Sequence, residues 1–158
     1  QFLVEHNLGI DCSGLATYIF QAIYQENKKI DIFKKIKIIS FFKNPWRWVV
    51  AWLRPIENIS VRVLANDKNS FLINDFQKIK PGDMLIRTNL RHIYLITEIE
   101  KTRDPLSIRF VYVHAPRPKQ TNYFGPGVFQ NTILLEKGNL SELSEKINDE
   151  VVVRRLKF

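Results

Sequence analysis

One cysteine and two histidines are the residues of this chain best suited to covalent chemistry. Cys12 is the single cysteine, and its neighbours Asp11 and Ser13 are residue types that start helices. The unpaired N–H groups and the dipole at a helix start lower the pKa of a thiol and stabilise an oxyanion. A thiolate nucleophile needs a base, and His92 begins one predicted strand while His114 ends the next. This pattern predicts a Cys–His nucleophilic site in which a second histidine orients the first.

Plainer interpretations of the same residues stay open at this point. A lone cysteine is usually inert packing, strand-end histidines are usually ordinary polar groups, and Asp11 and Ser13 serve equally well as helix caps. A metal site built from Cys12, His92 and His114 is a further alternative, although their separations match no common zinc signature.

A helix has to begin at Cys12 for the nucleophilic site to form. Downstream of it, apolar residues recur at helical spacing and predict one buried stripe: Leu15, Tyr18, Ile19, Ala22 and Ile23. The pattern fades at residues 26–28, where we expect the helix to end.

The two histidines have to lie on neighbouring strands. Residues 80–83, Lys-Pro-Gly-Asp, are a turn signature that leads into a predicted strand. The runs 92–99 and 108–114 are rich in β-forming residues and flank an Asp-Pro turn. We therefore expect a hairpin that brings His92 and His114 to the same edge of the sheet.

The remaining elements complete an α+β pattern. We expect a short helix opened by Pro45, a strand or extended arm at 61–63, a strand at 132–135, a helical turn at 141–146 and a closing strand at 151–156. Helices followed by strands linked by turns predict an α+β domain, with helices packed on a largely antiparallel sheet.

Length and composition limit the class of protein. The 158 residues suit a single domain, 1–158, and 45% hydrophobic with 25% charged residues exclude a disordered or collagen-like chain. A lone cysteine excludes an internal disulfide framework and any multi-cysteine metal site. No apolar run approaches the roughly 20 residues of a membrane-spanning helix, and no signal-peptide pattern is present at the start.

Nearly all of the net charge of +8 lies in one segment. From Lys28 to Arg54 the chain carries six lysines and two arginines against Asp31, and it also holds all three tryptophans. We call residues 28–58 the basic Trp-rich segment. It suits an anionic polymer or a membrane surface, whereas its plain alternative is a solvated basic helix. Nothing resembles a nucleic-acid module, so no nucleic-acid partner is expected.

Five short motifs resemble the NlpC family of papain-like cysteine peptidases, which cut the peptide stems of bacterial cell walls. Residues 9–15, Gly-Ile-Asp-Cys-Ser-Gly-Leu, closely resemble the nucleophile motif, and residues 80–85 resemble the turn into the first central strand. Residues 92–96 are similar to the strand with the histidine base, 113–116 to the strand end with the third polar residue, and 154–155 to the last strand. The motifs occur in the family's order and span most of the chain.

The resemblance implies a papain-like, NlpC-type fold and a role for each candidate residue. By this resemblance Cys12 is the nucleophile, His92 is the general base and His114 orients His92. Asp11 and Ser13 help to hold the free amine of the substrate, and backbone N–H groups around Cys12 and Ser13 bind the oxyanion.

The resemblance also implies a reaction and a location. The reaction is hydrolysis of peptidoglycan stem peptides through an acyl-enzyme, at the bond from D-glutamate to meso-diaminopimelate or lysine. No metal or organic cofactor is implied. The implied location is extracytoplasmic: secreted, periplasmic or associated with the cell wall.

The chain departs from the family pattern at four places, one of which is the long separation of His92 and His114, 114 − 92 = 22 residues. A Tyr-Gly-Gly type segment usually precedes the cysteine, but Phe-Leu-Val-Glu stands at 2–5. The family usually has Gly or Ala two residues after the histidine, and we expect Tyr94 to crowd the neighbouring helix or redirect its strand. The basic Trp-rich segment stands where the family has a shorter connection, and serves as a lid, a polymer-binding arm or a partner surface.

These departures leave two other functions open. If they mark lost catalysis, the chain is a binding or scaffolding domain for a cell wall or membrane surface on the same fold. Alternatively, the thiol transfers an acyl group to a lipid or an amine, because acyl transfer and hydrolysis share their first half-reaction.

Overall fold

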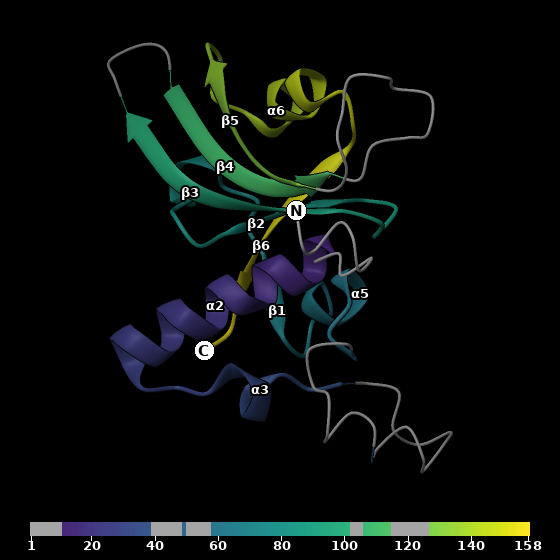
Figure 1. Cartoon of the computed structure of the whole chain (residues 1–158). Helices are drawn as coiled ribbons and strands as arrows, with labels where there is room; N and C mark the ends of the chain where they lie inside the picture. The colour runs from purple at the N-terminus through teal and green to yellow at the C-terminus, as the bar shows by residue number, and fades with distance from the viewer. Residues whose placement is uncertain (1–10, 39–48, 50–57, 102–105, 115–126) are drawn as a thin grey trace.

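The structure is a computed structural model that describes residues 11–38, 49, 58–101, 106–114 and 127–158. It shows an α+β architecture in which the N-terminal helix α2 (Cys12–Lys28) packs on a six-stranded antiparallel sheet (Figure 1). The short helices are α3 (Ile32–Lys35), α5 (Val61–Leu64), the 3-10 helix η3 (Phe76–Lys78) and α6 (Leu140–Ile147). The strands are β1 (Ser70–Leu72), β2 (Met84–Arg87), β3 (Ile93–Lys101), β4 (Leu106–His114), β5 (Gly127–Leu135) and β6 (Val151–Leu156).

The strand order is β1-β6-β2-β3-β4-β5, so the sheet is not a simple meander. The predicted hairpin is confirmed as β3 and β4, which pair in antiparallel register with Leu95 opposite Val111. The predicted closing strand is confirmed as β6, but it lies inside the sheet between β1 and β2. Strand β1 had no signal in the sequence because it is only three residues long.

Helix α2 has the predicted bounds but not the predicted buried face. Its buried residues are Ser13, Gly14, Ala16, Thr17 and Phe20. The predicted stripe is wrong, since Tyr18 is 50% exposed and Ile23 is 39% exposed. The small residues face the sheet because they allow the helix to approach closely. The hydroxyl of Thr17 stays satisfied there by donating to the carbonyl of Ser13 at 2.7 Å.

Two other predictions change. Residues 61–63 are not a strand or an extended arm but part of helix α5, where burial of Val61 and Leu64 outweighs the β preference of valine. The strand predicted at 132–135 begins earlier, at Gly127. Most of the predicted helix opened by Pro45 and the Asp-Pro turn between the two hairpin strands lie outside the described residues.

The sheet has a hydrophobic cluster on each face. Figure 1 shows α2 and α6 on opposite sides of the sheet. The α2 side holds Ala16 and Phe20 against Ile93 and Leu95, and the other side holds Leu143 of α6. Tyr94 belongs to the α6 side, because successive residues of a strand point to opposite faces. The expectation that Tyr94 crowds the neighbouring helix is therefore wrong.

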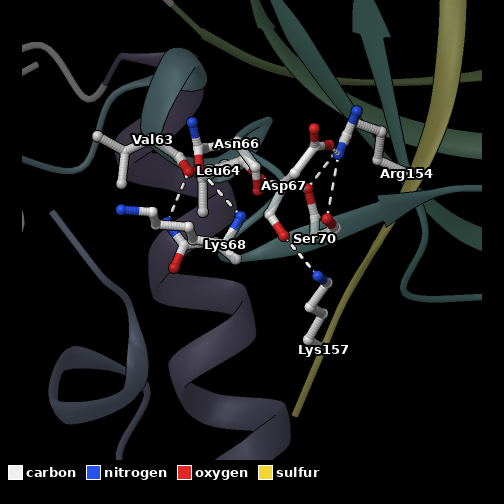
Figure 2. A network of polar contacts seen from close by, with 9 residues as sticks. Val63, Leu64, Asn66, Asp67, Lys68, Ser70, Arg154 and Lys157 are labelled. Atoms are coloured by element: carbon white, nitrogen blue, oxygen red, sulfur yellow. Dashed lines mark hydrogen bonds and ion pairs between the residues drawn. The ribbon is translucent and has the colours of Figure 1, made fainter. Parts of the chain in front are cut away.

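Two arginines at the end of β6 make ion pairs of different kinds. Arg155 donates from Nε to Asp83 Oδ1 at 2.6 Å and from Nη2 to Asp83 Oδ2 at 2.8 Å. Asp83 is fully buried, and this pair ties the start of β2 to the end of β6. Arg154 instead contacts Asp67 and Ser70, in the polar network of Figure 2. Asp67 is 92% exposed there.

Asp83→Asn should destabilise the fold by about 3 kcal/mol, because it leaves Arg155 without the buried charge that pairs with it. Asp67→Asn is the matched control, and it should cost less than about 1 kcal/mol because water screens that exposed pair. The free energy of unfolding in urea measures both. Equal losses in the two variants would contradict the assignment of Asp83 as the structural partner.

Glu142 closes the connection between β5 and α6. Its carboxylate accepts the backbone N–H groups of Glu136, Lys137 and Gly138 at 2.7, 2.8 and 3.0 Å. Burial alone would raise the pKa of Glu142, but these three hydrogen bonds and nearby Lys146 outweigh it and hold the pKa below its ordinary value.

The lowered pKa of Glu142 makes its contribution to stability depend on pH. The contribution is complete above the pKa of an unfolded glutamate, about 4.3, and is lost as pH falls through the lower folded pKa. We therefore expect Glu142→Gln to be less stable than the parent chain at pH 7, with the difference shrinking in acid. Urea denaturation at pH 7 and at pH 3 tests this, and an unchanged difference would contradict it.

Candidate functional site

Cys12 is the first residue of α2, and Asp11 is its N-cap. The Asp11 carboxylate accepts the N–H of Gly14, and the hydroxyl of Ser13 donates to the same oxygen at 3.0 Å. The helix-cap interpretation is thus confirmed for Asp11, which is exposed, while Ser13 is buried beneath it. The part of Asp11 and Ser13 in holding a substrate stays a prediction.

The thiol of Cys12 lies at the end of the β3–β4 hairpin. Cys12 is half-buried and packs against the hydrophobic cluster that contains Ile93, the first residue of β3. Ile93 lies opposite Ile86 of β2, but the hydrogen bonds to β2 involve His92 and Ile96, so the N–H of Ile93 points to the β4 side. On that side the register pairs begin only at Leu95 and Val111. The start of α2 is therefore held against the first residue of the strand that follows His92.

The environment of the sulfur changes the expected acidity of the thiol. Burial raises the pKa of Cys12, the N–H groups of Ile93 and Ser13 oppose that rise, and the negative charge of Asp11 adds to it. The net direction is upward. The expectation that the helix start lowers the pKa is wrong here because desolvation is the larger effect. At neutral pH the thiol keeps its proton until a base removes it.

His92 directly precedes β3 and is half-buried. Its ring packs edge-on against the ring of Tyr94, with centroids 4.6 Å apart and an interplanar angle of 78°. Arg87 Nε donates to the Tyr94 hydroxyl at 3.2 Å and also pairs with Asp149 at 2.7 Å. Tyr94 thus contacts the imidazole on one side and is anchored by Arg87 on the other.

Sequence reasoning missed this contact between Tyr94 and His92. The signal was present in the alternation of the strand, because residues two apart share a face. A tyrosine at this position therefore touches the histidine itself rather than α2. The ring of His92 packs with Tyr94, on the face of the sheet away from α2, so in this structure it is not brought together with the Cys12 thiol.

His114 ends β4, and its backbone pairs with Gly127 of β5. Leu95 lies three residues after His92, and Val111 lies three residues before His114. Since Leu95 and Val111 pair in antiparallel strands, residues 92 and 114 occur at the same end of the hairpin. The predicted common edge is confirmed for the backbone, while the side chain of His114 lies outside the described part of the chain.

Metal-binding clusters and membrane-spanning helices were sought among the described residues. In those ranges, no group of three histidine, cysteine, aspartate or glutamate side chains is arranged to hold a metal ion. None of the described helices combines the length and the apolar character needed to cross a membrane.

Comparison with family models, with curated proteins and with solved structures finds no match to this chain. The resemblance to the NlpC family accordingly rests on the five sequence motifs alone.

The reactivity of Cys12 toward iodoacetamide should report whether His92 takes its proton. In His92→Ala we expect slow alkylation at pH 7 that rises about tenfold per pH unit, to a midpoint above the ordinary thiol pKa of about 8.5. The parent chain should react faster than this variant between pH 6 and 7. The urea-unfolded chain supplies the reference for an ordinary thiol. Identical profiles for the parent and the variant would remove His92 as the base.

Proposed function

We propose that this chain is a cysteine peptidase of the NlpC type, with a papain-like fold, that hydrolyses peptidoglycan stem peptides. The observation that carries the proposal is the packing of Cys12, the first residue of α2, against the cluster that contains Ile93, the first residue of β3. Cys12 thus lies beside β3, the strand that His92 directly precedes, at the hairpin end where the backbone of His114 also occurs.

The proposed reaction has two halves. His92 takes the proton of the Cys12 thiol as the sulfur attacks the scissile carbonyl carbon. The C–N bond then breaks, the amine leaves with the proton from the imidazolium, and a thioester remains on Cys12. Water attacks the thioester while His92 takes a proton from it, and release of the acid restores the thiol. Because burial raises the pKa of Cys12, we expect proton transfer to accompany the attack.

The residues around the thiol fit an acyl-transfer site. The N–H groups at the start of α2 face the position where the oxyanion develops, as the family resemblance implies for Cys12 and Ser13. The exposed carboxylate of Asp11 lies next to the thiol in sequence, so it can meet the free amine of the substrate. The ring of Tyr94 packs against that of His92 on the face of the sheet away from α2, so His92 has to turn from Tyr94 toward the thiol to act as the base. His114 is the proposed third residue.

The proposed setting is extracytoplasmic. The basic Trp-rich segment, whose positive charges lie between Lys28 and Arg54, would attract an anionic wall polymer or a membrane surface, and the attraction should weaken as salt rises. Most of that segment lies outside the described residues.

The direct test is incubation with purified muropeptides and analysis of the products by mass. The parent chain should cut stem peptides, Cys12→Ala should give no product, and His92→Ala should lose about 10²- to 10⁴-fold in rate. Cys12→Ser serves as the closer match in size, and thermal melting checks that each variant is folded. Product formation by folded Cys12→Ala at the parent rate would overturn the proposal.

The packing of the His92 ring on Tyr94, on the face away from Cys12, favours one second candidate, a binding domain with the same fold and impaired catalysis. Such a domain would bind cell walls or anionic membrane surfaces without releasing fragments. Cosedimentation with purified walls, together with the product analysis above, separates the two functions. Equal binding by the parent chain and Cys12→Ala without any product would support this candidate.

A further inference from the structure

A cavity of about 340 Å³ lies at the other end of α2 from the thiol. Its walls come from the last turns of α2, from the 80–83 turn and from the chain after Arg155. Because a helix rises 1.5 Å per residue, Lys28 at this end lies about 24 Å along the axis from Cys12. The cavity is therefore separate from the candidate catalytic site.

One side of the cavity is aromatic. Phe20 and Tyr24 contact each other edge-on, with ring centroids 6.4 Å apart, and Tyr24 meets Phe158 in the same way at 5.5 Å. Phe20 is fully buried, whereas Tyr24 and Phe158 are only half-buried and can offer ring surface to a ligand. This side suits an apolar ring or chain.

The charged side chains that line the cavity carry a net positive charge. The only carboxylate among its lining side chains, Asp83, is already neutralised by Arg155 and accepts the N–H of Lys80 at 2.9 Å. Lys157 directs its ammonium to the carbonyl of Asp67 instead (Figure 2). Lys28 has its ammonium 4.9 Å from the centroid of the Tyr24 ring. Within the described ranges, no ion pair engages Lys28 or Lys80.

We infer that this cavity binds a small aromatic anion, with its ring against Tyr24 and Phe158 and its phosphate or carboxylate between Lys28 and Lys80. A concave, partly apolar pocket with a few convergent polar groups is the usual form of a small-molecule site, and its volume lies at the lower end of the range for such sites. The Tyr24 hydroxyl adds a donor, because burial and the charge of Asp83 raise the pKa of Tyr24 and keep it protonated.

Titration calorimetry with three probes tests the aromatic side and the positively charged side of the cavity separately. Phenyl phosphate carries both the ring and the charge, inorganic phosphate carries only the charge, and benzyl alcohol carries only the ring. We expect phenyl phosphate to bind at least about tenfold more tightly than either partial probe, and its affinity to fall as salt rises. Equal affinity for all three probes would overturn the inference.

Matched variants locate the bound probe. Lys28→Gln and Lys80→Gln should each lower the affinity for phenyl phosphate about fivefold, since each removes one charge contact at a partly exposed site. Lys137→Gln makes the same charge change on an exposed residue outside the cavity and should have no effect. Phe158→Ala should reduce the affinity for phenyl phosphate to that for inorganic phosphate, because it removes a ring that packs on the ring of the probe.

Cys12→Ala separates this inference from the proposed activity, because it removes the thiol and leaves the cavity intact. Phenyl phosphate should bind this variant as it binds the parent chain, whether or not the parent hydrolyses muropeptides. Loss of binding in Cys12→Ala, or unchanged binding in both lysine variants, would place the probe elsewhere and overturn the assignment.

Discussion

The close packing of α2 on the sheet is the constraint on which the candidate site depends. Small residues, Ser13, Ala16 and Thr17, lie between the helix and the strands, and they fix the rotation of the helix about its axis. A shift of one residue in the buried face would turn the helix by about 100°. With Tyr18 and Ile23 buried instead, Cys12 would no longer pack against the start of β3. The direction of the thiol is thus set by residues that carry no chemistry.

Local signals were enough to predict most of the elements of the fold. The cap at Asp11, the turn at 80–83 and the hairpin all involve residues close together in sequence, so their patterns are visible without coordinates. The buried face of α2 was not predictable from hydrophobicity, because Thr17 satisfies its hydroxyl within the helix and so can be buried. The sequence placed Cys12 at a helix start, but the direction of its pKa shift needed the tertiary burial of the sulfur.

The proposed chemistry combines a protonated thiol on the α2 face of the sheet with an imidazole that packs on Tyr94, on the opposite face. Tyr94 occupies a position at which the resembling family has a small residue, and here it packs against His92 while Arg87 holds its hydroxyl. Such a contact restricts the ring of His92 at some cost in freedom of motion. Because the thiol pKa is raised, the basicity and orientation of His92 would govern the rate of the proposed attack.

The position of β6 within the sheet has a consequence for how the chain acquires its structure during synthesis. Strands β2 to β5 are neighbours in the sheet in the order of the sequence. The other edge of β2 is paired only when β6, the last strand in the sequence, forms hydrogen bonds with it. Until residues 151–156 have left the ribosome, that edge exposes unpaired backbone groups, which favour association with other chains. The sheet therefore closes late, and a nascent chain that stalls before β6 would depend on chaperones to stay unaggregated.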